Sequence, residues 1–309
     1  MRILVGVLNF FWALAAAAGP STIDSDGRAV SLKAPAHRIV SLAPHVTELL
    51  FAIGAGSKVV GVSEYSDYPP EALRLPRVSS SGGVDIEKVL SLRPDLTVAW
   101  RFEATRGAID RLEKFGIPVF LSEPRQLGEI ADNMESLGAL TGAVAASRTA
   151  AAKFRMDLDR LRRNYSGRTR LKVFYHLSMR PLMSLNGRQM VSSAIELCGG
   201  VNVFADAPAL APIVDAEAVF AADPDVIVAA QRNPQESSWQ APWKERFGGL
   251  RAVREESLFA VDATIMHRQG PRVLVAVESL CRQLDEARQR SATRRGTDKT
   301  LPTKADTRR

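Results

Sequence analysis

Short apolar runs alternate with amphipathic stretches along most of the chain. In the first half, the runs are "RIVSL", "KVVGV", "LTVAW" and "PVFLS", and a stretch with helical spacing follows each of them, beginning near Thr47, Asp85, Thr105 and Leu127. A regular strand–helix order of this kind predicts a parallel sheet covered by helices on both faces. We therefore expect an N-terminal α/β lobe over residues 38–142.

A second strand–helix series follows. It begins at "LKVFYHL" (171–177), includes a helix over 192–197, and ends with "SLFAVDA" and a last helix near 273–283. These residues predict a C-terminal α/β lobe over 170–286. Residues 143–166 are rich in Ala, Leu and Arg and contain no Pro or Gly. That composition predicts one long helix connecting the two lobes.

The two lobes carry an internal repeat. Residues 84–100 and 214–230 align without a gap and are identical at eight of 17 positions. Each copy has an Asp that can cap a helix (Asp85, Asp215), a Glu two residues later, and a Pro-Asp before a buried strand. Two units that converged on the same capping residues are the alternative. Two similar lobes are the better interpretation.

Charge is concentrated at the C-terminal end. The chain has 309 residues, 46% of them hydrophobic, and a net charge of +7. Residues 287–309 hold eight Lys/Arg against two Asp, a net charge of +6, which leaves +1 for the rest. We expect a basic, disordered tail on a nearly neutral body, and no nucleic-acid partner.

The N-terminus has the layout of a secretory signal peptide. Arg2 precedes an apolar stretch and then small residues up to Gly19, so we expect a signal peptide over 1–18, cleaved near Ala18. A membrane helix is the alternative, but the apolar part is short for a span of about 20 residues. No cysteine lies near the cleavage region, which excludes lipid attachment there. The mature protein is expected to be soluble and exported.

The chain has two cysteines, Cys198 and Cys281. A disulfide between them fits an oxidising compartment, and two buried free thiols are the alternative.

Aromatic, thioether and amide side chains follow the predicted strands. Tyr65 comes after "KVVGV", Trp100 after "LTVA", and Met183 in the segment after "LKVFYHL". Ligands of parallel sheets bind outside the carboxyl ends of the strands, so these residues suit a large, flat, partly apolar ligand. For "VSEYSDYPP" the alternative is a turn in which Asp67 caps a short helix that starts at the prolines.

No catalytic or metal-binding pattern is present. None of the four histidines (His37, His45, His176, His267) pairs with a nucleophile in a G-x-S-x-G elbow, and H-E-x-x-H is absent. The sequence therefore predicts a protein that is not an enzyme, with no metal site of its own.

Five segments together carry a family resemblance. They are "RIVSLAPHVTELLFAIGAG", "GVSEYSDYPP", "DIEKVLSLRPDLTVAW", "IELCGGVNVF" and "GPRVLVAVESLC", between about Arg38 and Leu284. This set resembles the periplasmic cobalamin-binding proteins of bacterial ABC importers, in a wider family that also takes ferric siderophores and haem. The resemblance implies the helical-backbone periplasmic binding protein fold: two Rossmann-like α/β lobes with parallel sheets, joined by one rigid helix, with the ligand between them and only a small hinge motion.

The resemblance also implies site residues. The expected ligand contacts are Tyr65, Ser81, Trp100, Met183, Ile265, Met266, His267 and Arg268. Ser81 replaces a pocket tryptophan of the family, and Thr264 and Ile265 replace an acidic–aromatic pair. Glu87 and Glu217 match the two surface carboxylates that dock on the permease. Cys198 and Cys281 match the family's disulfide.

The expected function follows from these matches. The protein would be a periplasmic monomer without a cofactor that captures cobalamin or a related corrinoid between its lobes. It would then deliver this ligand to an ABC transporter permease dimer and its ATPase. A ferric-siderophore or haem carrier is the alternative, for which Arg101, Arg180 and Arg268 could supply positive charge. An exported α/β enzyme is a further alternative.

Overall fold

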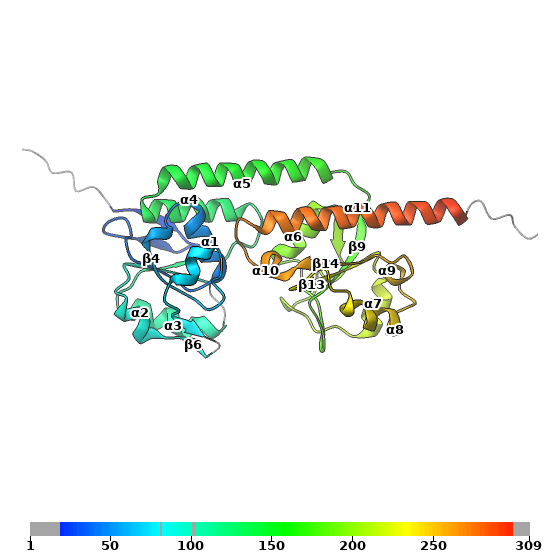
Figure 1. Ribbon diagram of the computed structural model, residues 1–309, viewed down its shortest axis with the longest axis horizontal. Coiled ribbons are helices and arrows are strands. Elements are labelled where there is room, and N and C mark those ends of the chain that lie inside the picture. Colours follow the sequence, from blue (N-terminus) through cyan, green and yellow to red (C-terminus); the bar gives the residue numbers. More distant parts are fainter. Residues whose placement is uncertain (1–18, 81, 101–102, 299–309) are drawn as a thin grey trace, which may run out of the picture.

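Two α/β lobes lie side by side beneath one long helix (Figure 1). The structure, a computed structural model, describes residues 19–80, 82–100 and 103–298. The predicted fold class is confirmed. The expected signal peptide, residues 1–18, lies outside the described residues.

Each lobe contains a four-stranded parallel sheet, and the strand order is the same in both. The N-terminal sheet has the order β4-β3-β7-β8, and the C-terminal sheet the order β12-β9-β13-β14. In each sheet the first strand of the sequence lies between the second and the third. The N-terminal strands are β3 (Ile39–Ser41), β4 (Val59–Val62), β7 (Leu96–Ala99) and β8 (Val119–Leu121). The C-terminal strands are β9 (Leu171–His176), β12 (Gly200–Asn202), β13 (Val226–Gln231) and β14 (Leu258–Asp262).

Helices cover both faces of each sheet because alternate strand residues point to opposite sides. In β3, Ile39 packs into one core with α1 and α4, whereas Val40 packs into a second core with α2 and α3. The N-terminal helices are α1 (Pro44–Ala52), α2 (Ile86–Ser91), α3 (Glu103–Lys114) and α4 (Glu129–Thr141). In β9, Tyr175 faces α6 and α11, and Phe174 faces α7 and α8. The C-terminal helices are α6 (Met190–Leu197), α7 (Ala216–Ala222), α8 (Ala241–Arg246), α9 (Arg251–Arg254), α10 (Ala263–Met266) and α11 (Val273–Asp298).

The internal repeat occupies equivalent places in the two lobes. Its first copy spans α2 and β7, and its second copy spans α7 and β13. Asp95 accepts hydrogen bonds from the backbone N–H groups of His37 and Arg38, at 2.8 and 2.9 Å. Asp225 accepts the equivalent bond from the N–H of Lys172, at 2.7 Å. In each lobe, the Pro-Asp of the repeat thus fastens the third strand to the start of the first.

Helix α5 (Val144–Tyr165) connects the lobes. Its buried residues include Phe154, Leu158 and Leu161, which recur at helical spacing on one face. That face packs against α4 of the N-terminal lobe and against α6 and α11 of the C-terminal lobe. One apolar core therefore runs along α5 through both lobes.

The expectation of a disordered tail from residue 287 is wrong for residues 287–298, which continue α11. Ala287 and Ser291 are buried against the C-terminal lobe. The guanidinium of Arg288 donates to the carbonyl oxygens of Thr169 and Cys198, both at 2.8 Å. The charged residues thus alternate with small buried ones, a pattern that the composition alone does not reveal. Residues 299–309 lie outside the described part.

Several short elements complete the fold. Three are hairpins: β1 (Ser21–Ile23) with β2 (Ala29–Ser31), β5 (Ser79–Ser80) with β6 (Gly83–Val84), and β10 (Ser178–Met179) with β11 (Leu182–Met183). Three are 3₁₀ turns: η1 (Gly56–Lys58), η2 (Pro70–Arg74) and η3 (Ser238–Gln240). The first hairpin was not predicted, and the buried carboxylate of Asp24 ties it to β8 through the N–H of Leu121 at 3.4 Å.

The predicted disulfide is confirmed: the sulfur atoms of Cys198 and Cys281 are 2.02 Å apart, joining the end of α6 to α11. None of the helices in the described ranges is long and apolar enough to cross a membrane.

Candidate functional site

Two hollows that share Trp100 lie at the carboxyl ends of the strands. The first, here the N-lobe hollow, has a volume of about 270 Å³. Its lining includes Tyr65, Trp100, Ser80, Gly83 and Val84. The second, the interlobe hollow, has a volume of about 180 Å³ and places Trp100 opposite residues of the C-terminal lobe. Those residues are Leu177, Leu185, Gln189, Met190, Val191, Met266, His267 and Gln269. Together the hollows form a cleft with one aromatic wall and one largely apolar wall.

Tyr65 occupies the loop after β4. Its backbone is left-handed, with φ of 62°, and its side chain is 61% exposed at the N-lobe hollow. A left-handed conformation is uncommon for a residue with a side chain and needs support from its surroundings. Here the carbonyl oxygen of Tyr65 accepts hydrogen bonds from the N–H of Asp67 and from the guanidinium of Arg268, both at 3.0 Å. The loop therefore presents an aromatic ring that the core does not cover.

The ring of Trp100 packs against a buried histidine, His45. The rings of Trp100 and His45 meet edge to face, with centroids 6.2 Å apart. The Nε2–H of His45 donates to the carbonyl oxygen of Ser122 at 3.1 Å. Burial, together with the nearby positive charge of Arg268, lowers the pKa of His45 to about 4, against the opposing effect of the Ser122 hydrogen bond. His45 is therefore neutral and fixed in orientation, a role that the sequence did not reveal.

His267 lines the interlobe hollow, but its Nε2 is occupied. This atom lies 2.9 Å from the hydroxyl oxygen of Tyr175, a hydrogen bond in the partly buried wall. Burial lowers the pKa of His267. Ligation of a metal through Nε2 would require breaking this bond.

Arg268 pairs with two carboxylates of the N-terminal lobe and is not among the lining residues of either hollow. Its Nη1 lies 2.6 Å from Asp67 Oδ1 and 3.2 Å from Glu48 Oε1. The hydrogen bond from Arg268 lowers the pKa of Asp67. Asp67 thus pairs with Arg268 and does not cap η2, whose first turn has no side-chain cap. The charge of Arg268 is therefore already neutralised by partners of the protein.

The remaining predicted contact residues are only partly brought together. Met266 lines the interlobe hollow and is buried. Met183 and Ile265 are half-buried and are not among the lining residues of either hollow. Ser81 lies outside the described residues, although its neighbour Ser80 lines the N-lobe hollow.

Some lining residues were missed. Gln189, Met190 and Val191 stand at the start of α6 and face Trp100 across the interlobe hollow. The sequence offered one signal for these three residues: they lie at the start of a helix that follows a strand, where ligands of α/β proteins often bind.

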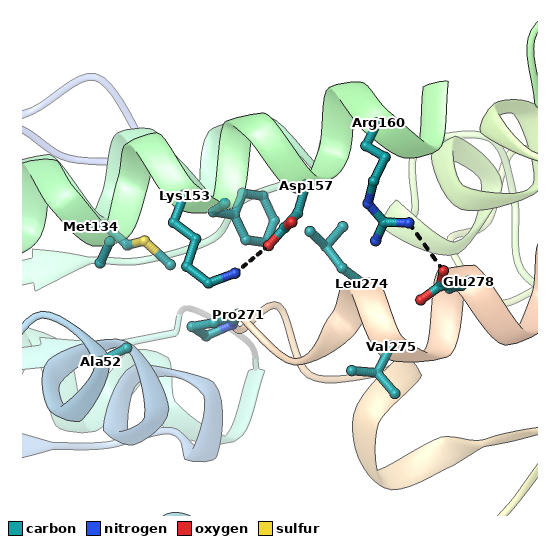
Figure 2. A pocket seen from close by; sticks show the side chains of 11 residues that line it. Ala52, Met134, Lys153, Asp157, Arg160, Pro271, Leu274, Val275 and Glu278 are labelled. Atoms are coloured by element: carbon teal, nitrogen blue, oxygen red, sulfur yellow. Dashed lines mark hydrogen bonds and ion pairs between the residues drawn. The ribbon is translucent and has the colours of Figure 1, made fainter. Parts of the chain in front are cut away.

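A separate hollow of about 530 Å³ lies between α5, α1 and the start of α11. Figure 2 shows its rim, where Lys153 points to Asp157 and Arg160 points to Glu278. These ion pairs measure 2.7 and 3.2 Å. The first pair lies within α5, and the second joins α5 to α11. These charged groups are therefore paired with one another at the rim.

Glu87 and Glu217 are exposed in the first turns of α2 and α7. Asp85 and Asp215 cap these helices by accepting from backbone N–H groups at 2.9 and 2.7 Å. Both helices lie on the side of the molecule away from α5 (Figure 1). The two carboxylates are thus exposed on equivalent elements, one per lobe.

No group of three or more His, Cys, Asp or Glu side chains suited to a metal ion occurs within residues 19–80, 82–100 and 103–298. The cleft instead offers apolar and aromatic surface with a few polar groups, of which Glu64 at the N-lobe hollow is acidic.

Comparison with known proteins gives the family. A family model described as periplasmic binding protein matches residues 39–264, which is most of the chain. The chain belongs to the periplasmic binding protein family. This periplasmic binding protein is 39% identical over 250 residues to the vitamin B12-binding protein of Vibrio cholerae, covering 81% of the chain and 90% of that relative.

Solved structures agree with the fold of this periplasmic binding protein. The crystal structure of the periplasmic vitamin B12 binding protein BtuF of Vibrio cholerae matches with a TM-score of 0.75 and 38% identity, covering 82% of this chain and 98% of that one. A periplasmic heme-binding protein from Roseiflexus sp. RS-1 matches with a TM-score of 0.70 at 23% identity, covering 81% and 98%. The second likeness concerns the fold alone.

Proposed function

We propose that this protein captures cobalamin or a related corrinoid in the cleft and delivers it to an ABC transporter. The observation that carries the proposal is the pair of hollows that share Trp100, with Tyr65 on one side and Leu177, Leu185 and Met190 on the other. A corrin is broad, flat and partly apolar, and aromatic faces bind such surfaces well. The similarity to vitamin B12-binding proteins supports the same ligand class.

The neutralised state of Arg268 argues against an anionic siderophore. Such a ligand needs unpaired cations, but Arg268 already contacts Glu48 and Asp67. Arg101 lies outside the described residues, and Arg180 is exposed on the turn between β10 and β11.

Transport requires a permease partner, and Glu87 and Glu217 are the docking residues in this proposal. One carboxylate per lobe offers two equivalent contacts to a permease dimer, whose ATPase supplies the energy. The carrier acts as a monomer, without catalysis or a cofactor. Residues 1–18 act as its cleaved signal peptide into the periplasm, and no lipid is attached.

Isothermal titration of the protein from residue 19 onward tests the ligand. Cyanocobalamin and cobinamide are expected to bind more tightly than haem or a panel of ferric siderophores. Absence of corrinoid binding tighter than about 1 μM overturns the proposal. Preferential binding of haem or a siderophore assigns the cleft to the other ligands of the family.

A further inference from the structure

One buried glutamate joins the two lobes beside the cleft. Glu48 lies on α1, and its side chain is only 2% exposed. Its Oε1 lies 2.6 Å from Arg272 Nη2 and 3.2 Å from Arg268 Nη1, and its Oε2 lies 2.9 Å from Arg272 Nε. Both arginines belong to the segment between α10 and α11 of the C-terminal lobe. A buried carboxylate is stable only when it is paired and hydrogen-bonded, as here.

The same two arginines hold the loop that carries Tyr65. Arg268 bonds to the Asp67 carboxylate at 2.6 Å and to the Tyr65 carbonyl oxygen at 3.0 Å. The guanidinium of Arg272 lies 3.8 Å from the centre of the Tyr68 ring, a cation–π contact. Glu48 therefore pairs with two arginines of the C-terminal lobe, and each of them contacts the loop of the N-terminal lobe. We call Glu48, Arg268 and Arg272 the interlobe clamp.

Within the N-terminal lobe, the loop is also held at Ser63 and Ser66. The Arg77 guanidinium donates to both of their carbonyl oxygens, and the Ser66 hydroxyl bonds to the hydroxyls of Ser63 and Thr47.

A Cβ built on Gly270 would lie 3.2 Å from Glu48 Oε2, so the segment between α10 and α11 approaches the Glu48 side chain closely at this point. Hollows of about 530 and 550 Å³ flank the contact, and both are lined by Ala52 and Pro271. The ring of Tyr65 itself is exposed and gains no support from the core.

We propose that the interlobe clamp is a positioning device for the ligand site, in which Arg268 acts on the ligand through Tyr65 and not by touching it. Both groups that fix the direction of Arg268, Glu48 and Asp67, belong to the protein, and its remaining hydrogen bond goes to the Tyr65 backbone. The opposite lobe thus supplies one of the two hydrogen bonds to the Tyr65 carbonyl oxygen, and the N–H of Asp67 supplies the other. This inference depends on the proposed corrinoid function in one respect: the binding test below uses a corrinoid as the ligand.

The first test needs no ligand. Hydrogen exchange of the peptide covering 63–75, followed by mass spectrometry, reports how firmly the loop is held. Arg268→Gln and Asp67→Asn are expected to speed exchange in this peptide and leave β7 and β13 unchanged. Asp67 is 54% exposed, so this variant tests the clamp even if a change at a buried member prevents folding. Glu71→Gln is the matched control, because it removes an exposed carboxylate of the same segment outside the clamp.

The second test is a double-mutant cycle measured by titration with cyanocobalamin. Arg268→Gln is expected to weaken binding about tenfold in the native background, and by less than about twofold when Tyr65→Ala is already present. Equal losses in both backgrounds mean that Arg268 contacts the ligand directly, and they overturn the positioning role.

The two tests separate this inference from the proposed function. Unchanged exchange in Arg268→Gln and Asp67→Asn overturns the clamp whatever the ligand is. If exchange responds but the native protein does not bind cyanocobalamin, the clamp on the loop stands and the corrinoid proposal falls.

Discussion

At the scale of single residues, the cleft depends on side chains that do not face it. His45 supports Trp100 from behind, and its orientation is fixed by the Ser122 carbonyl oxygen. Tyr65 is likewise maintained by Arg268. These supports are neutral or neutralised, so they position the two aromatic residues without adding a net charge beside the cleft.

Acid is expected to destabilise the protein through its buried histidines. His45 has a folded pKa of about 4, whereas an unfolded histidine titrates near 6.5. Between these values the unfolded state binds the proton and the folded state does not, so stability is full above about pH 6.5 and falls as the pH approaches 4. Between these pH values, each such histidine lowers the free energy of unfolding by about 1.4 kcal/mol per pH unit. His176 adds to this effect, because burial lowers its pKa to about 4 as well.

Urea unfolding at pH 7, 5.5 and 4.5 measures this effect. His45→Gln keeps a donor near Ser122 but removes the titrating group. The free energy of unfolding of the variant is expected to fall less steeply with acid, and to approach the native value at low pH. Parallel curves for the two proteins would contradict a depressed pKa at His45.

At the scale of elements, one helix–strand unit is repeated in the two lobes of this chain. It places a capped helix and the third strand of each sheet in the same arrangement. The exposed glutamates in the first turns of these helices need no role in folding beyond about 0.3–1 kcal/mol of interaction with the helix dipole.

Charge reversal at both glutamates is the matching prediction. Glu87→Arg with Glu217→Arg is expected to abolish uptake of the ligand into cells and leave its affinity for the isolated protein unchanged. Uptake assays and titration measure the two quantities. Glu71→Arg with Glu245→Arg, which changes one exposed glutamate per lobe outside the repeat, is the control. A loss of affinity in the first pair would remove the docking role.

The sequence patterns predicted the strands and helices better than they predicted the contacts between distant residues. The strands were found because both of their faces are buried, which leaves continuous apolar runs such as "LTVA". The first hairpin was missed because its three-residue strands are mostly exposed. The end of α11 was missed because Arg288 is ordered by carbonyl groups 90 residues away in sequence. In the interlobe clamp, the two arginines lie 220 and 224 positions from Glu48 in sequence, and no local pattern reports such a contact.

At the scale of the whole molecule, α5 and a core that passes through both lobes make the protein one structural unit. The disulfide reinforces its C-terminal part, where it closes a sequence separation of 83 residues. A cross-link over a loop of this length restricts the unfolded chain more than the folded one.

Removal of the disulfide is therefore expected to lower stability without changing the cleft. Cys198→Ala with Cys281→Ala should reduce the free energy of unfolding by about 4 kcal/mol, since the loop-entropy relation gives about 4 to 5 for this length and the fold keeps its apolar core. Urea unfolding measures the loss, and titration with cyanocobalamin serves as the control. A change below about 1 kcal/mol would show that the unfolded chain is already restricted without the bond.

The continuous helix α5 also has a consequence for kinetics. Between Val144 and Tyr165 the connector contains no Gly or Pro at which a helix usually kinks. We therefore expect the two lobes to move little relative to each other when the ligand binds. Stopped-flow mixing with cyanocobalamin should then give a single phase whose rate rises linearly with ligand concentration, with no plateau from a slow closing step. The association rate constant should fall in the ordinary range of about 10⁵ to 10⁷ M⁻¹ s⁻¹, and variants of the cleft should differ mainly in the rate at which the ligand dissociates.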